Sequence, residues 1–540
     1  MVTRNEALDP YRLLAAAIVL LAICWLPPVP IDETRYLAVA WNMHWRGDWL
    51  VPWLDGMPYP DKPPLLFWLI NVTWWVTGIH AWAARLLQVA MGLLTLPLLR
   101  RLARELGADA STASLAGWLW LGSLTFAGYA GALMFDMLLC LCVLVAWLGG
   151  VWLWYGRLRS GAAMLALGLG LGLLAKGPVS LLVGGLPVLL GPWWCAPTPR
   201  PLRRPYLAIA LGLLGGAALA LAWAVPAAMH GGPAYANAIF LGQTAGRVAE
   251  SFAHNRALWW YLPIVPVLLL PWLIGLGRTG PAREREAAAP RCDRFALAAT
   301  LPAFLAFCVI SGKQPHYLLP LVPAIAPAAA LRLASGRWRV VGWRIGLLLL
   351  AMPVGAWFAL GRFAPQAPPG VHLALAGAAL VGAILLVRGR RALDVATAAL
   401  AMIVVAALVK GAFLAGSASR YSVATASRMV AEAQRADVPL LMLNHQNGLF
   451  TFAGRLTAAI PTAPGPRYVA AWVRAHPRGW VISSDMDYDY AAVPLYRQPF
   501  LGRRLAIWRA SDIAREAMAA SEARQTARGR PPHSKAPVGM

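Results

Sequence analysis

Two charged residues stand directly before a long apolar segment in the first part of the chain. The stretch YPDKPPLLFWLI, residues 59–70, places Asp61 and Lys62 next to a pair of prolines and a run of apolar residues. An ammonium group is a compact partner for a phosphate, and a carboxylate can serve as a general base. These residues are therefore candidates for chemistry on a phosphate-bearing substrate at the edge of an apolar layer.

A second pair of acids follows another apolar run. In IDETRYLAVAWNM, residues 31–43, Asp32 and Glu33 come shortly after the first apolar segment. The simplest explanation is a helix N-terminus with acids in its first turn, which contributes about 1 kcal/mol. That explanation accounts for one acid and leaves Arg35 and Tyr36 unexplained. We expect Asp32 to act as a general base or to orient an acceptor group.

Lysine is rare in this chain, and its positions are selective. The sequence contains 43 arginines and only five lysines, and Lys62, Lys176 and Lys313 all lie beside or near Gly or Pro at the ends of apolar runs. Such lysines can simply extend their ammonium groups to the membrane surface. Three of five in similar positions favour a function in binding phosphate. Other polar residues in or near these motifs are Tyr59, Asp136 in FDM, and His316 and Tyr317 in SGKQPHYLLP.

The elements that must position these residues are membrane helices. The chain is 59% hydrophobic and 13% charged, whereas a soluble domain carries about 25% charged residues. Continuous apolar runs of spanning length recur many times, which predicts a polytopic α-helical membrane protein and excludes a barrel. The first run, around 13–26, reads as a retained helix. The net charge of +25 comes mostly from arginines in short loops, as the positive-inside rule requires, so nucleic acid is not an expected partner.

Arginine clusters predict which loops face the cytoplasm. An even number of spans must separate any two clusters, so Arg100 and Arg101 would face outward if 64–79 crossed the membrane. We therefore expect 64–79 to lie along the outer surface, where its tryptophans are favoured. The remaining count is thirteen spans, which places the C-terminus outside. They are 11–29, 83–103, 112–131, 134–155, 162–176, 178–194, 205–228, 258–276, 295–311, 318–333, 341–361, 371–387 and 392–412.

The composition changes after residue 413, where the transmembrane domain is expected to end. Segments 439–444, 479–485 and 504–510 read as strands, and 417–435 and 468–476 read as helices. This predicts a small α/β domain over 414–515, outside the membrane, followed by a disordered tail over 516–540. With this topology the unusual polar residues gather on the outer face, beginning with the first outer loop, 30–82.

These motifs, in this order, resemble a known family. DETRYLAVA, YPDKPPLLFWL, FDM, LLAKGP, HNRALWWYLP and SGKQPHYLLPLVPA are similar to motifs of the bacterial lipid A aminoarabinose transferases. More broadly they resemble polyprenyl-phosphate-dependent glycosyltransferases of the GT-C fold, which include the protein O-mannosyltransferases. The resemblance implies a donor sugar, 4-amino-4-deoxy-L-arabinose, carried on undecaprenyl phosphate, and a lipid A phosphate as acceptor. It also implies an active site and C-terminal domain on the periplasmic side of the bacterial inner membrane.

The resemblance assigns roles to individual residues. Asp32 matches the family's catalytic carboxylate, and Lys62 matches a contact to the carrier phosphate. Asp61 stands where the aminoarabinose enzymes usually have Glu, which pairs with a loop histidine, here His254, on a zinc ion. The expected catalytic residues are thus Asp32, Arg35 and Lys62, and the substrate-binding residues are Glu33, Tyr36, Tyr59, Asp136, Lys176, Lys313, His316 and Tyr317.

Several alternatives stay open at the level of sequence. His254 lies in a loop, where a lone histidine is usually only solvated. The transferred sugar could instead be a hexose or a uronic acid, and the acceptor the lipid A core, another glycan or a protein. A transporter is the alternative from another class, but transporters place polar groups near the membrane midplane in repeated halves, and no internal repeat is seen here.

Overall fold

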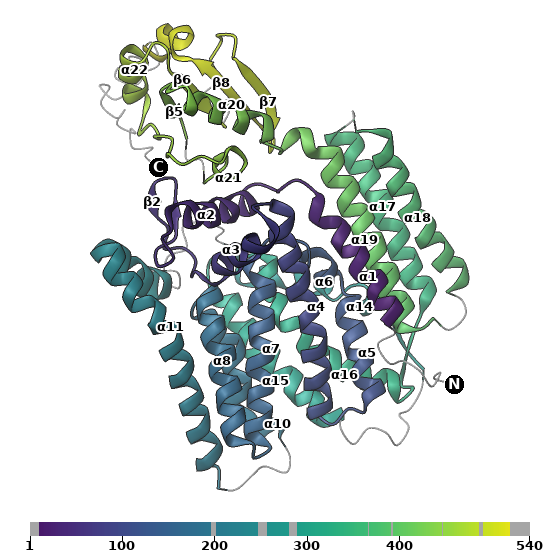
Figure 1. The fold of residues 1–540 in the computed structure, drawn as a ribbon. Helices are drawn as coiled ribbons and strands as arrows, with labels where there is room; N and C mark the ends of the chain where they lie inside the picture. Colours follow the sequence, from purple (N-terminus) through teal and green to yellow (C-terminus); the bar gives the residue numbers. More distant parts are fainter. Residues whose placement is uncertain are drawn as a thin grey trace, which may run out of the picture. The chain divides into compact units, whose positions relative to one another are not determined.

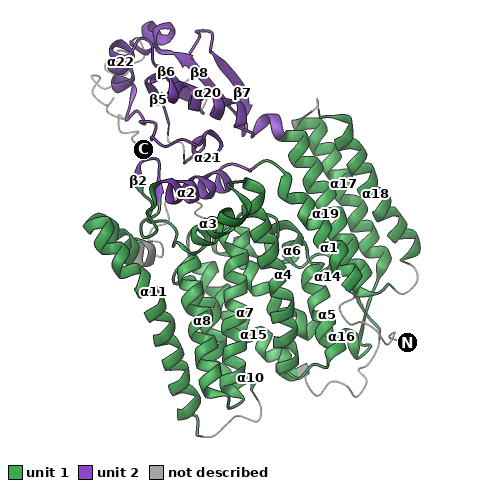
Figure 2. Cartoon of the chain, in the orientation of Figure 1, with its two compact units in different colours: residues 1–27, 46–52, 58–417 green, residues 28–45, 53–57, 418–540 purple. Residues whose placement is uncertain are grey.

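The computed structural model describes residues 10–195, 201–246, 256–279, 289–364, 367–389, 393–444, 447–484 and 490–518 (Figure 1). The chain divides into two compact units (Figure 2). Unit 1 comprises Met1–Pro27, Arg46–Pro52 and Pro58–Ser417, and unit 2 comprises Pro28–Trp45, Trp53–Met57 and Ala418–Met540. Part of the first outer loop therefore belongs to the same compact unit as the C-terminal region, although more than 350 residues separate the two in sequence.

Unit 1 is a helical bundle. Among the described residues, nine helices are long and apolar enough to cross a membrane, and each coincides with one of the thirteen predicted spans. The helices of unit 1 are α1 (Pro10–Ala22), α3 (Leu65–Thr77), α4 (Ala81–Glu105), α5 (Ala110–Leu121), α6 (Leu124–Tyr129), α7 (Phe135–Trp154), α8 (Leu158–Lys176), α9 (Leu186–Leu189), α10 (Gly191–Trp194), α11 (Arg203–Asn237), α13 (Ile264–Leu268), α14 (Trp272–Gly275), α15 (Ala289–Val309), α16 (Ala326–Ala334), α17 (Gly342–Phe363), α18 (Pro369–Arg388) and α19 (Val395–Ser417).

The other four predicted spans, 11–29, 112–131, 178–194 and 258–276, are present as shorter helical pieces. Glycine and proline interrupt them, because proline removes a backbone donor and glycine stabilises the helix poorly. The segment 112–131, for example, is divided into α5 and α6 at Gly122 and Ser123. The number of complete membrane crossings therefore stays a prediction, while the helical nature of all thirteen segments is confirmed.

Two of the interruptions bond to each other. The amide of Leu124, at the start of α6, donates to the carbonyl oxygen of Leu270 at 2.7 Å. The hydroxyl of Thr125 donates to the carbonyl oxygen of Leu268 at 2.6 Å. Backbone groups released by a break inside a membrane protein must find partners in the protein, because lipid supplies none. The segment at the start of α6 thus supplies the donors, and the segment at the end of α13 supplies the acceptors.

Helices α7 and α8 pack at very short range because glycine lies in their interface. A Cβ atom on Gly168 would lie 2.4 Å from the backbone nitrogen of Ala146, and one on Gly149 would lie 2.5 Å from the nitrogen of Leu165. Only glycine permits this approach. The helices run antiparallel, so the N-terminal end of α7 meets the C-terminal end of α8, which brings together the residues at those two ends.

Unit 2 contains a four-stranded mixed sheet with the order β5-β6-β8-β7. Its strands are β5 (Leu440–Met442), β6 (Trp480–Ser483), β7 (Tyr496–Phe500) and β8 (Arg503–Arg509). Strands β5 and β6 are parallel, and β8 is antiparallel to both of its neighbours. The predicted strands β5, β6 and β8 are confirmed, and β7 was not predicted.

One helix covers each face of this sheet. Met442 and Ile507 pack with residues of α20 (Ala424–Arg435), whereas Leu441 and Trp508 pack with residues of α22 (Pro466–Ala475). This alternation follows from the period of two in a strand. The same unit contains α21 (Thr451–Gly454), α2 (Asp32–Arg46) and the short strand β1 (Trp53–Leu54), which pairs with β2 (Met57–Pro58). Helix α2 carries the DETRY motif, which contains the predicted catalytic residues Asp32 and Arg35.

Candidate functional site

The first turn of α2 orients the carboxylate of Asp32. Arg35, one turn later, forms an ion pair with Asp32 Oδ1, and the hydroxyl of Tyr36 donates to the same oxygen at 3.4 Å. These residues meet because positions three and four apart share a helix face. Within the described residues, both bonds go to Oδ1, and 47% of the Asp32 side chain is exposed. Oδ2 is therefore available to a ligand while Oδ1 fixes the orientation of the group.

The neighbouring acid, Glu33, has a different environment. Its residue is 6% exposed, and Oε2 accepts a hydrogen bond from the backbone amide of Val29 at 2.7 Å. This bond ties the chain that enters α2 to the first turn of the helix. Glu33 thus supports the start of the helix, and its predicted contact with substrate stays a prediction, whereas Asp32 is half-exposed beside Arg35 and Tyr36.

In unit 1, four of the predicted residues form one cluster. Lys176, the last residue of α8, forms an ion pair with Asp136 of α7. The ammonium nitrogen of Lys176 lies 4.7 Å from the centre of the Tyr317 ring. Nε2 of His316 lies 3.9 Å from the other oxygen of Asp136. The two motifs LLAKGP and SGKQPHYLLP therefore meet at the N-terminal end of α7.

The ion pair at the centre of this cluster is buried. The side chains of Asp136 and Lys176 are 3% and 14% exposed. An ammonium group has three donors, and in the described part of the chain Lys176 uses one of them, on Asp136. Ionisable residues within the membrane part of a protein usually mark a functional site. The remaining donors of Lys176 suit an anionic ligand such as a phosphate oxygen.

Lys313 lies in a different setting from Lys176. It is 2% exposed, and its ammonium group donates to the carbonyl oxygens of Arg256 at 2.9 Å and Ile310 at 2.7 Å. These bonds satisfy carbonyls at the end of α15 and in the segment before α13, which is a supporting function. Among the described residues Lys313 uses two of its three donors, and its predicted contribution to binding stays a prediction.

The YPDKPP loop reaches the same end of unit 1 through aromatic packing. Tyr59 is buried, and its ring centre lies 6.5 Å from that of Phe67 in an edge-on arrangement. Phe67 in turn lies 5.5 Å from Phe135, which immediately precedes Asp136. Lys62 is half-buried directly before Pro63 and Pro64, and α3 begins at Leu65. The expected start of a helix after the two prolines is confirmed.

Of the two residues of the predicted metal site, the structure describes one. Asp61 is exposed and described, but His254 lies outside the described residues. Across the part of the chain that the structure describes, no group of three His, Cys, Asp or Glu side chains is close enough to hold a metal ion. Asp61 has the carboxylate oxygen that a divalent ion accepts as a ligand. The pairing of Asp61 with His254 on a metal stays a prediction from the resemblance.

Sequence reasoning did not identify two residues near the unit 1 cluster. Tyr129, at the end of α6, has its ring centre 6.2 Å from that of His316. Gln88 of α4 is fully buried, and its amide donates to the carbonyl oxygen of Met134 at 2.8 Å, just before α7 begins. Both interrupt apolar runs, and a polar residue inside a predicted span was the signal that pointed to them.

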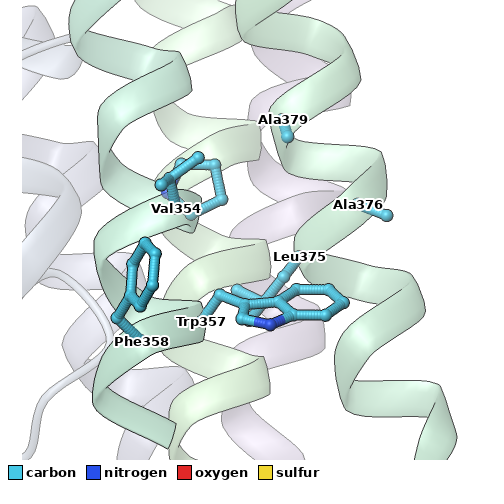
Figure 3. Close-up of a pocket in the computed structure, with 7 residues that line it drawn as sticks. Val354, Trp357, Phe358, Leu375, Ala376 and Ala379 are labelled. Atoms are coloured by element: carbon cyan, nitrogen blue, oxygen red, sulfur yellow. The ribbon is translucent and has the colours of Figure 1, made fainter. Parts of the chain in front are cut away.

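A cavity elsewhere in unit 1 has a different chemistry. It has a volume of about 290 Å³ and lies between α17 and α18. Its lining includes Trp357 and Phe358 of α17 and Leu375, Ala376 and Ala379 of α18 (Figure 3). None of its lining residues is titratable, so the cavity suits an apolar chain and cannot perform group transfer. The candidate site is therefore the polar cluster and not this cavity.

Comparison with known proteins agrees with this picture. A protein-family model described as dolichyl-phosphate-mannose-protein mannosyltransferase matches residues 61–230. The undecaprenyl phosphate-alpha-4-amino-4-deoxy-L-arabinose arabinosyl transferase of Edwardsiella ictaluri is 32% identical over 316 residues, which are 57% of this chain and 55% of that protein. The enzyme of the same name from Yersinia enterocolitica is 30% identical over 325 residues. The chain spans about half the length of these curated relatives.

A solved structure covers nearly the whole chain. ArnT from Cupriavidus metallidurans in the apo state aligns over 92% of this chain and 97% of its own, with a TM-score of 0.70 and 19% sequence identity. The same protein has also been solved bound to undecaprenyl phosphate, and that structure gives the same TM-score. The chain is therefore a multi-pass membrane protein with the fold of that ArnT, which confirms the predicted GT-C fold class.

Proposed function

We propose that this chain is an integral-membrane glycosyltransferase. It moves 4-amino-4-deoxy-L-arabinose from undecaprenyl phosphate to a lipid A phosphate, at the periplasmic face of the bacterial inner membrane. The observation that carries the proposal is the buried Asp136–Lys176 pair, with His316 and Tyr317, inside a membrane protein of this fold. The similarity to transferases named for this donor supports the choice of sugar.

The reaction exchanges one bond at the sugar for another. An oxygen of the acceptor phosphate forms a bond to the anomeric carbon, and the bond from that carbon to the carrier phosphate breaks. The electron pair of the broken bond stays with the leaving undecaprenyl phosphate, which gains negative charge. The anomeric carbon becomes positive during the exchange. The protein therefore needs cations for the leaving phosphate and a carboxylate for the acceptor or the sugar.

Asp32 supplies the carboxylate. Its fixed orientation on α2 and its exposed Oδ2 allow it to accept a proton from the acceptor or to stabilise positive charge at the anomeric carbon. Arg35 and Tyr36 hold it in position.

Lys62 and Lys176 supply positive charge for the carrier phosphate. Lys176 has donors that Asp136 does not use, and an ammonium group binds phosphate as a point charge. Lys62 lies in the loop three residues before α3, whose apolar residues suit the attachment point of a polyprenyl tail. The transition state places more charge on the leaving oxygen than the ground state does, so these cations accelerate the step as well as bind the donor.

Mass spectrometry of lipid A tests the proposal directly. The protein is expressed in a strain that lacks its own transferase and still makes the aminopentose donor, and the Asp32→Ala variant serves as the control. A mass increase of one aminopentose, lost in the variant, is the expected result. A different increment keeps the enzyme class and replaces the sugar. No increment, with the protein present in the membrane, contradicts lipid A as the acceptor.

A further inference from the structure

The C-terminal region of unit 2 makes specific contacts with α2, the helix that carries Asp32. Trp41 of α2 donates from its indole Nε1 to the carbonyl oxygen of Leu456 at 2.8 Å, across 415 residues of sequence. The guanidinium of Arg455 lies 5.3 Å from the centre of the same indole ring and 4.0 Å from the ring of Phe452. Arg455 also donates to the carbonyl oxygen of Phe452 at 2.6 Å. A cation–π contact and a hydrogen bond therefore both fix the indole of Trp41 in α2.

Arg455 adopts a conformation that a side chain rarely takes. It ends α21 with φ 52° and ψ 41°, in the left-handed region that disfavours residues other than glycine. Such conformations persist where the surrounding contacts demand them, and they cluster at functional positions. Its packing between two aromatic rings also lowers the pKa of Arg455 from its usual value, because the charge loses solvent, but a guanidinium remains protonated at neutral pH.

Gly448 forms a second contact with α2, and this contact is too close to admit a side chain. Gly448, with φ 71°, donates its amide to both carboxylate oxygens of Asp55, at 3.1 and 3.0 Å. A Cβ atom on Gly448 would lie 2.6 Å from Cβ of Ala38 in α2 and 2.7 Å from Cδ1 of Leu54. Glycine is therefore required here for two reasons, the backbone conformation and the close approach to α2.

At about 100° per residue, Ala38 and Trp41 fall on the opposite half of the helix from Asp32 and Tyr36. Arg35 lies between the two halves, and its Cα would lie 3.7 Å from a Cβ on Gly448. The segment 448–456 thus contacts α2 at Ala38 and Trp41, within the same compact unit, and leaves the face of Asp32 open. We propose that this segment is a positioning element for the transferase reaction, with Gly448 and Arg455 setting the place of the Asp32 carboxylate through α2.

This inference rests on the proposed function, and it assigns the C-terminal domain a part in catalysis. A carboxylate that must reach a reacting sugar tolerates little displacement, since an error of about 1 Å can cost roughly 100-fold in rate. A loss of position therefore changes kcat, whereas binding of the carrier by lysines of unit 1 leaves KM for the donor nearly unchanged.

The test uses a clash and its relief in the full-length protein. Gly448→Ala should displace α2 and lower kcat by about 10- to 100-fold, with KM for the donor within about twofold of wild type. Adding Ala38→Gly removes the nearer of the two atoms that the new methyl meets. The other atom, Cδ1 of Leu54, ends a flexible side chain that can shift, so the double variant should recover kcat to within about threefold of wild type. The double variant contains a helical glycine and a strained alanine, so it is less stable than wild type and yet more active than the single variant.

Gly502→Ala is the matched control. Gly502 has φ 80° in the same domain, so the substitution imposes similar backbone strain, but a Cβ there meets nothing within 4 Å. Its kcat should equal that of wild type. Trp41→Phe provides a second route, because it keeps a ring beside Arg455 and removes the donor to Leu456. It should lower kcat severalfold. If Gly448→Ala does not reach the membrane, the kcat of Trp41→Phe tests the positioning role instead, and an unchanged kcat would contradict that role.

Hydrogen exchange of the peptide 32–46 gives a readout that does not depend on turnover. Exchange should rise in Gly448→Ala, return in the double variant and stay unchanged in Gly502→Ala. If wild type transfers no sugar, or Asp32→Asn remains as active as wild type, the proposed function is wrong. If Asp32→Asn is inactive while Gly448→Ala keeps full kcat, or while the double variant stays as slow as the single one, the positioning role is wrong.

Discussion

Lys176 at the end of α8 and Asp136 at the start of α7 form an ion pair that is almost entirely removed from solvent. The glycine-lined interface of the two helices makes this meeting possible. A charge pair in such a place costs desolvation energy that an apolar pair would avoid. The pair lies where four predicted site residues meet, so we expect it to serve binding rather than stability.

Substitutions of this pair separate stability from function. Lys176→Met leaves a buried carboxylate without its partner, which should cost about 3 kcal/mol and abolish transfer. The double variant Asp136→Leu, Lys176→Met removes both charges, so it should recover most of the thermal stability and remain inactive. Thermal unfolding of the purified protein and sugar transfer are measured on the same samples. Recovery of activity in the double variant would show that the pair only supports the fold.

The two acids of the DETRY motif should behave differently. Asp32→Asn removes the charge of a half-exposed side chain, so we expect a loss of at least about 100-fold in kcat with unchanged thermal stability. Glu33→Gln weakens the bond to the Val29 amide, so we expect a stability loss of about 1 kcal/mol and a much smaller effect on turnover. The comparison requires thermal unfolding and initial rates for both variants. Equal effects of the two substitutions on kcat would contradict the separate roles.

Lys62 should be needed for use of the carrier phosphate. Lys62→Ala should reduce transfer below about 1% of wild type, because the leaving phosphate loses a cation, while the amount of protein in the membrane stays the same. Lys62→Arg keeps the charge and should retain part of the activity. Lys410→Ala is the matched lysine control, since Lys410 donates to the carbonyl oxygen of Gly128 in α6. Full activity of Lys62→Ala would exclude its contact with the phosphate.

The predicted metal site can be tested through its two residues. If Asp61 and His254 share a divalent ion, Asp61→Ala and His254→Ala should each lower activity by a similar factor. The double variant should then be no worse than either single one, because both remove the same ion. Elemental analysis of the purified protein measures the metal directly. Multiplicative losses, together with a metal content that the variants leave unchanged, would rule out a shared ion.

The strands of unit 2 could be predicted from sequence where their own residues show a local pattern of apolar runs and turns. The strands at 440–442, 480–483 and 503–509 were predicted from short apolar runs between turn residues. Strand β7 was missed because YRQPF contains Pro499 and two long polar residues. Proline is tolerated only at the edge of a sheet, and β7 occupies an edge of this one. Its position depends on β8 and could not be recognised from its own residues.

The contacts of the candidate site residues could not be predicted from their types alone. Lysines 176 and 313 looked alike in sequence, each near glycine at the end of an apolar run. The structure gives one a carboxylate and an aromatic ring, and the other two backbone carbonyls. The contact between Trp41 and Leu456 was equally hidden, because no local pattern relates residues 415 positions apart.

The paired breaks at α6 and α13 have a consequence for biogenesis. Thr125 leaves the ribosome 143 residues before Leu268, the residue whose carbonyl oxygen it will bond. At roughly 5–20 residues per second, that interval is on the order of ten seconds. If the predicted span 112–131 enters the lipid first, the amide of Leu124 lacks this partner in a nonpolar solvent during that time. We therefore expect the insertion machinery to shelter this segment until the later segment arrives. A chain truncated before residue 258 should stay bound to that machinery or be degraded.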